Sequence, residues 1–161
     1  MWFFMITCYL MTFLSLLFLL TAFAQNFLQF NILQADHVTF MILTSIVYLF
    51  TETLVIFFFV GTGVSVRDYT KDHGLDPSFH QRSIAIKRRV YPPLLLNILF
   101  MIILFVLVGA VNTNRFPAWG YQLIFLGCIL HYLKVKWLQN SCFRDNTQII
   151  LDMSGIDRKV T

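Results

Sequence analysis

The chain has 161 residues, of which 58% are hydrophobic and 12% charged, with a formal net charge of +4 and a mean hydropathy of +0.71. Soluble domains carry about 25% charged residues, so this composition excludes an ordinary soluble enzyme. The apolar residues gather in blocks of about 20, which leaves no room for a separate catalytic domain. We therefore expect an all-α integral membrane protein that forms a single helical domain.

Four apolar blocks are long enough to cross a hydrocarbon core of about 30 Å, because a helix rises about 1.5 Å per residue. The predicted spans are residues 2–24, 38–64, 93–111 and 119–137, with an inner loop at 65–92 and an inner tail at 138–161. Tyr121, Gln122 and His131 interrupt the fourth block. However, Trp119 and Trp137 near its ends resemble the aromatic belts found at membrane interfaces.

Lys and Arg are distributed unevenly among the segments between these spans. Segment 25–37 has none and loop 112–118 has only Arg115, whereas loop 65–92 has six. The others lie at the inner end of the fourth span or in the tail: Lys134, Lys136, Arg144, Arg158 and Lys159. Because positively charged loops stay on the cytoplasmic or matrix side, this pattern predicts four spans with both termini inside, in a bacterial or mitochondrial inner membrane. Basic residues beside a membrane favour contact with anionic lipids rather than with nucleic acid.

A three-span alternative comes from Ala22-Phe23-Ala24, which has the small-x-small form of a signal-peptidase site after an apolar stretch. No Lys or Arg precedes that stretch, and the apolar run is long for a signal peptide. We therefore expect residues 1–24 to be retained as the first helix.

The inner loop contains a predicted helix of its own. Asp76-Pro77 has the pattern of an N-cap followed by Pro at the first helical position, and it predicts a short amphipathic helix that extends to about Val90. The sequence YPP is expected to end this helix and to start the third span. A basic amphipathic helix lies on a membrane surface or docks onto a partner. The side chains expected to contact lipid head groups are Arg82, Lys87, Arg88 and Arg89.

Glu52 is the only glutamate of the chain and lies in the middle of the second predicted span, in YLFTETLVIFFF. An ionised carboxylate in hydrocarbon costs at least about 2.5 kcal/mol, so such a residue is normally protonated, paired, or turned toward protein or water. At about 100° per residue, four other polar side chains share with Glu52 a stripe about 100° wide. The stripe consists of His37, Thr44, Ser45, Tyr48 and Glu52. We expect it to face another helix rather than lipid.

Two interpretations of this polar stripe remain open. In the first, Glu52 is a hydrogen-bonded strut between helices, within the chain or in a partner subunit, where each polar contact contributes about 0.6 kcal/mol. In the second, His37, Tyr48 and Glu52 form part of a proton or ion path, or line a pocket for a quinone head group. No Lys or Arg lies at mid-depth in any predicted span. We therefore expect Glu52 either to carry a proton or to meet a cation supplied by a partner.

His37 and His131 are candidate ligands of a b-type heme. His37 lies at the outer end of the second span, whereas His131 lies about six residues, or about 9 Å, from the inner end of the fourth. Two axial ligands of one heme must be nearly level, so these histidines are not expected to hold one heme within the chain. Each remains a candidate ligand of a cofactor shared with another subunit.

No motif indicates a catalytic residue or a metal site. Cys8, Cys128 and Cys142 have no metal-ligand spacing, and two of them lie within spans, so neither a metal site nor a disulfide framework is expected. Asp and His side chains also gather in the inner loop, where Asp76 and His80 have an i, i+4 spacing, but they fit no zinc or EF-hand signature.

The small size, the absence of inverted repeats and the unpaired Glu52 stripe favour a non-catalytic accessory subunit of a larger membrane complex over a stand-alone transporter. Its expected partners are other integral membrane subunits and anionic lipids. Side chains of the His, Tyr and Glu types suit proton or quinone handling, so an energy-transducing complex is the expected setting. Two alternatives remain: an electron-transfer subunit that binds heme b or quinone, and an oligomeric proton or ion channel centred on Glu52.

Overall fold

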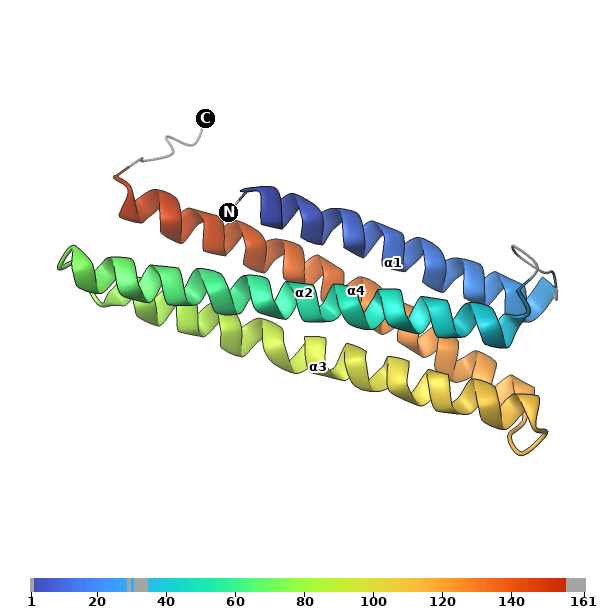
Figure 1. Ribbon diagram of the computed structural model, residues 1–161. Coiled ribbons are helices and arrows are strands. Elements are labelled where there is room, and N and C mark those ends of the chain that lie inside the picture. The colour runs from blue at the N-terminus through green and yellow to red at the C-terminus, as the bar shows by residue number, and fades with distance from the viewer. Residues whose placement is uncertain (1, 29, 31–34, 156–161) are drawn as a thin grey trace.

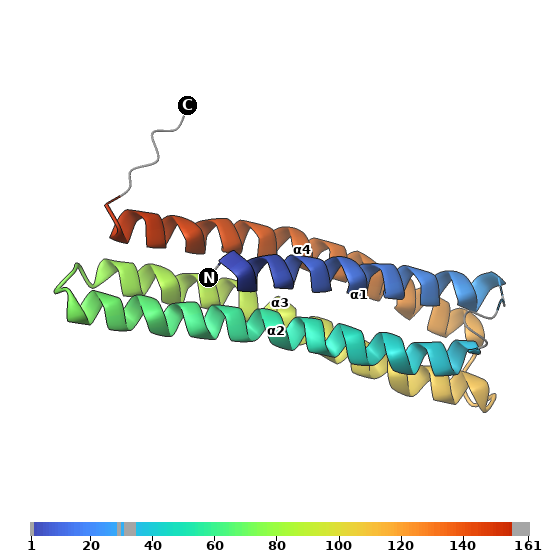
Figure 2. The ribbon, with the colours of Figure 1, turned by 45° about the horizontal axis from the view of Figure 1, so that its top comes forward.

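A computed structural model describes residues 2–28, 30 and 35–155 and shows a bundle of four long helices (Figure 1). The helices are α1 (Trp2–Leu28), α2 (His37–Asp72), α3 (Ser78–Asn112) and α4 (Ala118–Met153). Consecutive helices run antiparallel, and α1 and α3 each pack against both α2 and α4 (Figures 1 and 2). The predicted all-α architecture is confirmed. Segment 31–34 and the last part of the predicted tail, 156–161, lie outside the described residues.

Three of the helices are long and apolar enough to cross a membrane. Their most apolar windows have mean hydropathies of 2.3 in α1, 2.0 in α2 and 3.0 in α3. These values indicate a multi-pass membrane protein. Among the described helices, α4 is less apolar than these three, since Gln122, His131, Lys134 and Lys136 lower the mean hydropathy of its apolar part.

The helices extend well beyond the predicted spans on one side. Helices α2, α3 and α4 have 36, 35 and 36 residues, which corresponds to about 53 Å each. They extend toward the loop 73–77, which we call the basic end because Arg and Lys are concentrated there; the end with loop 113–117 is the opposite end. Most of the predicted inner loop and the first part of the predicted tail are therefore helical.

The prediction of a separate amphipathic helix that ends at YPP is wrong. Helix α3 continues through Pro92 and Pro93, and its buried positions keep helical spacing on both sides of them, from Val90 to Leu94. The two prolines remove the backbone bonds that would reach the carbonyls of Arg88 and Arg89. Those residues are exposed, so water can satisfy the carbonyls while the packed face of the helix continues unbroken.

Short turns join the last three helices. Gly74 has a φ of 60°, which suits a residue without a Cβ, and it follows the C-cap of α2. Asp76 accepts a hydrogen bond from the backbone N–H of Ser78 (2.9 Å) at the start of α3. The predicted capping role of Asp76 is thus present, one residue before the N-cap that the helix bounds assign to Pro77.

Two apolar clusters fill the bundle, one toward each end. The opposite-end cluster takes buried side chains from all four helices, among them Leu19, Phe40, Met101 and Phe125. The basic-end cluster is built mainly by α2, α3 and α4, and the fully buried residue that α1 contributes to it is Cys8. The level between the two clusters is occupied by polar side chains, described below.

Helix α1 is shorter than its neighbours toward the basic end (Figures 1 and 2). Near its first residues, Phe4 stacks on Phe58 of α2, with ring centroids 5.9 Å apart. Beyond this level the described residues form three helices, and we refer to residues 61–72, 78–88 and 144–153 as the three-helix segment.

Candidate functional site

Glu52 is fully buried at the boundary between the two apolar clusters, where it forms an ion pair with Lys136. Oε1 of Glu52 lies 2.8 Å from Nζ of Lys136, and the side chains are 0% and 12% exposed. Helix α2 brings Glu52 to this level 15 residues after its start, and α4 brings Lys136 there 18 residues after its start. A buried ion pair is tolerated only if further hydrogen bonds and contacts satisfy both partners.

This pair corrects the prediction that the chain offers no cation to Glu52. Lys136 was assigned to the inner end of a span ending at residue 137, but α4 continues to Met153, which places Lys136 in mid-helix. The long lysine side chain then reaches across the bundle interior to α2. Neither a partner subunit nor a proton is required to neutralise Glu52.

Asn97 of α3 links the ion pair to His131. Nδ2 of Asn97 donates a hydrogen bond to Oε1 of Glu52 (3.1 Å), and Oδ1 of Asn97 accepts one from Nδ1 of His131 (2.7 Å). The amide orientation that serves Glu52 therefore places the proton of the imidazole ring on Nδ1. Lys136 also donates to Oε1 of Gln139 (2.9 Å). We call Glu52, Asn97, His131, Lys136 and Gln139 the polar network.

Two tyrosines cover the polar network on its opposite-end side. Nζ of Lys136 lies 4.7 Å from the ring centroid of Tyr132, a cation–π distance. The rings of Tyr48 and Tyr132 are 5.1 Å apart, and the Tyr132 hydroxyl donates to the backbone oxygen of Thr12 in α1 (3.1 Å). Within the described residues, the Tyr48 hydroxyl and Oε2 of Glu52 are buried without a hydrogen-bond partner. All four helices thus meet around the network.

The remaining residues of the predicted polar stripe serve local roles. Thr44 and Ser45 are buried, and their hydroxyls donate to the backbone oxygens of Phe40 and Met41, at 2.9 and 2.7 Å. His37 lies at the start of α2, where its Nε2 is 3.1 Å from the hydroxyl of Tyr121. The stripe faces α3 and α4 along its length, but its members do not form one connected chain.

The structure does not bring the two candidate heme ligands to one level. His37 contacts Tyr121, whereas His131 lies ten residues further along α4, which corresponds to about 15 Å. Each ring already has a hydrogen-bond partner, Tyr121 for His37 and Asn97 for His131.

The four residues predicted to contact lipid head groups lie on the part of α3 nearest the basic end. Nη1 of Arg82 lies 2.7 Å from Oδ2 of Asp152 in α4, and Nη1 of Arg89 lies 3.5 Å from Oδ2 of Asp145 in the same helix. Lys87 packs across Gly63 of α2, where an added Cβ would meet its Nζ. Arg88 is exposed. Arg82, Lys87 and Arg89 therefore join α3 to its neighbours as well as carrying charge.

Lys136, Asn97 and Gln139 are the residues of the site that sequence reasoning missed. Buried positions of α4 recur every three or four residues from Tyr121 to Ile149, and this spacing runs past Trp137 without a break. The spacing was a usable signal that α4 is longer than the predicted span. It also places Gln139 on the packed face of the helix.

The polar network consists of a buried ion pair, Glu52 with Lys136, and the side chains hydrogen-bonded to it. His131 is its partly exposed member. A carboxylate, an ammonium group and an imidazole at this spacing can hold a proton or fix the register of three helices. The amide of Asn97 positions His131 relative to Glu52. Comparison with family models, with curated proteins and with solved structures finds no match to this chain.

Proposed function

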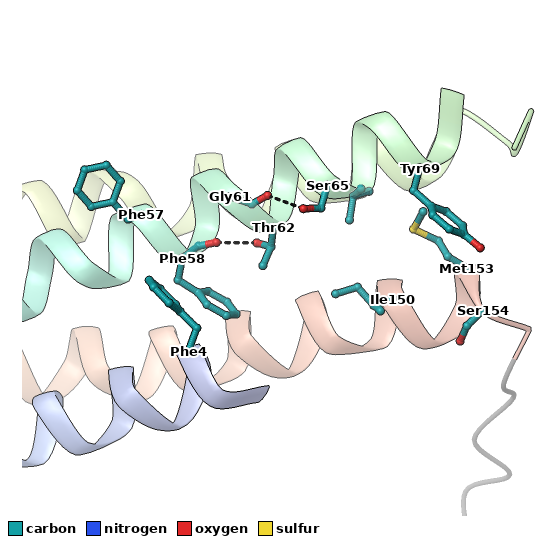
Figure 3. A pocket seen from close by; sticks show the side chains of 11 residues that line it. Phe4, Phe57, Phe58, Gly61, Thr62, Ser65, Tyr69, Ile150, Met153 and Ser154 are labelled. Atoms are coloured by element: carbon teal, nitrogen blue, oxygen red, sulfur yellow. Dashed lines mark hydrogen bonds between the residues drawn. The ribbon is translucent and has the colours of Figure 1, made fainter. Parts of the chain in front are cut away.

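We propose that this protein is a four-span accessory subunit of a larger membrane complex, and that its three-helix segment binds an apolar helix of a partner subunit at the inner side of the membrane. The supporting observation is an apolar groove beside the first residues of α1. The groove has a volume of about 520 Å³ and lies between α2 and α4 (Figure 3).

The lining of the groove is uncharged and rich in apolar and small side chains. Phe4 and Phe58 form one end, and Tyr69 and Met153 lie at the other (Figure 3). In the four-helix part of the bundle, α1 fills the corresponding position between α2 and α4. An apolar helix that continues the line of α1 would complete a fourth position in the three-helix segment.

Small residues on α2 give this groove the character of a helix–helix interface. Gly61 and Ser65 line it with the small-xxx-small spacing that lets helix backbones approach closely. A Cβ added at Gly61 would meet nothing within 4 Å. The hydroxyls of Thr62 and Ser65 donate to Phe58 and Gly61 backbone oxygens, at 2.9 and 3.1 Å, so this face offers an incoming helix an apolar surface.

Exposed aromatic and aliphatic side chains support four spans rather than three. On α4 they form a stripe bounded by Trp119 and Trp137, which are 67% and 82% exposed. The stripe covers about 27 Å of helix, close to the hydrocarbon thickness. Lys136 does not oppose this placement because Glu52 neutralises it inside the bundle. With the basic end on the cytoplasmic or matrix side, both termini lie inside, in a bacterial or mitochondrial inner membrane.

The test is native purification in mild detergent through a C-terminal tag, followed by mass spectrometry. We expect other membrane subunits to copurify in fixed stoichiometry with the unchanged chain. Gly61→Leu should remove them, because its side chain fills the groove. Gly127→Leu is the matched control, since Gly127 of α4 is also helical and exposed, with open space around it. A pure homo-oligomer, or equal copurification with both variants, would contradict the proposal.

The polar network supports a second candidate, proton handling in an energy-transducing complex. The specific observation is that Oε2 of Glu52 and the hydroxyl of Tyr48, one helical turn apart, are both buried without a partner in the described part of the chain. Glu52→Gln should then abolish proton flux in liposomes while the subunit still assembles. Failure to assemble would instead assign Glu52 a structural role.

The electron-transfer alternative is tested on the same purified material by its visible absorption spectrum. A Soret band that disappears with His37→Ala or His131→Ala would support heme binding beside a partner subunit. A colourless sample of the intact complex would remove heme from consideration.

A further inference from the structure

We propose that the cavity between α3 and α4 beside the polar network binds the phosphate group of an anionic phospholipid. This cavity has a volume of about 340 Å³ and is separate from the groove between α2 and α4. Its volume falls within the range of about 300–1,000 Å³ typical of ligand sites. The proposal rests on the four-span placement of α4, but not on the docking of a partner helix.

The cavity combines cationic and apolar side chains in the way a lipid head group requires. Its basic residues are Arg89 of α3 and Lys134 of α4, and His131 lines it as well. Lys134 is exposed and forms no ion pair among the described residues, and Arg89 has only a long contact of 3.5 Å with Asp145. Arg binds phosphate through its planar fork, and Lys binds it as a point charge.

The position of the cavity corresponds to the boundary of the bilayer. On α3, Pro93 separates the basic residues from the apolar part of the helix, and on α4 the exposed Trp137 closes the apolar stripe. Basic pockets between transmembrane helices on the cytoplasmic or matrix side bind anionic head groups. Exposed side chains on the opposite-end side, such as Leu96 and Leu133, provide a surface for acyl chains.

His131 connects this cavity to the buried ion pair. Nδ1 of His131 donates a hydrogen bond to Oδ1 of Asn97, and the other ring nitrogen, Nε2, takes no part in this bond. The phosphate group would therefore lie beside the rim of the polar network, with Arg89 and Lys134 as its main contacts.

The experiment uses the full chain in bilayers and the fluorescence of Trp137, with Trp2 and Trp119 replaced by Phe. Brominated phosphatidylglycerol and brominated phosphatidylcholine serve as quenchers at equal mole fractions. We expect phosphatidylglycerol to bind preferentially near Trp137. The double variant Arg89→Gln/Lys134→Gln should reduce this preference by about fivefold for each cation removed.

Two further variants separate a site from general surface charge. Arg88→Gln/Lys71→Gln removes two exposed basic residues that do not line the cavity, and it should leave the preference within about twofold. Ser141→Leu fills the cavity without a change of charge and should reduce the preference. An equal loss in the Arg88/Lys71 variant, or no loss with Ser141→Leu, would overturn the proposal.

Two additional measurements identify the source of the phosphate group and distinguish failure of the phosphate site from failure of the four-span placement. Inorganic phosphate that removes the preference, at an ionic strength matched with chloride, would show that the cavity takes phosphate from solution. A chain that retains only Trp119 reports the other end of α4. Absence of quenching at Trp137 by either lipid would contradict the four-span placement, whereas equal quenching by both lipids would contradict the phosphate site alone.

Discussion

The opposite-end cluster and the basic-end cluster differ in how completely the four helices enclose them. Around Phe40, Met101 and Phe125 each helix contributes to the packing, and the bundle is closed. Around Phe58, Val66 and Ile149 the packing comes mainly from α2, α3 and α4, and a groove remains between α2 and α4 beside the first residues of α1. The difference places the groove, and with it the partner site that we propose, beside the first residues of α1.

The polar network marks the boundary between these two regions. Inside a membrane, apolar side chains do not strongly select one helix register, because lipid is as apolar as they are. A buried ion pair with defined hydrogen bonds selects a register, because misalignment leaves a charge without its partner. We infer that Glu52, Asn97 and Lys136 align α2, α3 and α4 at this level.

The largest expected effect comes from breaking the ion pair at this boundary. Lys136→Met should lower the free energy of unfolding by about 3–5 kcal/mol, because it leaves the Glu52 carboxylate buried and unpaired. The double variant Glu52→Leu/Lys136→Met should recover most of that loss, since both charges are removed. Reversible unfolding in mixed micelles measures both. Equal destabilisation by the single and double variants would show that the pair is not coupled.

A smaller effect on the free energy of unfolding should distinguish Gly63, which packs against α3, from Gly61, which lies in the open groove. Gly63→Ala is expected to lower the free energy of unfolding by about 1 kcal/mol, because the new Cβ displaces the end of the Lys87 side chain and lies 3.1 Å from Oγ of Ser83. Gly61→Ala, in the open groove, should be neutral or stabilising by up to about 1 kcal/mol. The same unfolding assay applies, and Gly63→Ala/Lys87→Ala should recover part of the loss. Similar values for the two single variants would mean that the groove is closed in the free protein.

The smallest expected effect concerns the surface of the three-helix segment and depends on pH. The hydrogen bonds from Arg82 and Gln148 lower the pKa of the Asp152 carboxyl. A depressed folded-state pKa adds stability above the ordinary carboxyl pKa, and this stability is lost as the pH falls through the lower folded-state value. The effect is small because both partners of the ion pair are partly exposed.

Thermal unfolding of the unchanged chain and of Arg82→Gln, measured from neutral to acidic pH, checks this prediction. The difference between the two proteins should shrink as Asp152 becomes protonated. A difference that stays constant with pH would show that Arg82 stabilises the segment by packing rather than by charge.

The sequence signal most easily misjudged was the helical spacing of apolar residues where it continues past a proline or a tryptophan. Pro92-Pro93 suggested a helix end, yet the buried face continues from Val90 to Leu94 and beyond. Trp137 marks the end of the fourth predicted span, with a tail from residue 138, yet α4 continues to Met153. In both places packing on one face of the helix outweighed a local signal on the exposed face.

The sequence by itself determined the helical class, the apolar segments and the concentration of basic residues at one end, because these follow from hydropathy and charge along a single chain. It also indicated, from the amphipathic arrangement of its polar neighbours, that Glu52 faces away from lipid. The partner of Glu52 was decided only by the tertiary structure. Lys136 is 84 positions away, and only the lengths and packing of α2 and α4 bring the two groups to one level. The groove between α2 and α4 and the cavity between α3 and α4 likewise depend on which helix faces pack together, which no local pattern encodes.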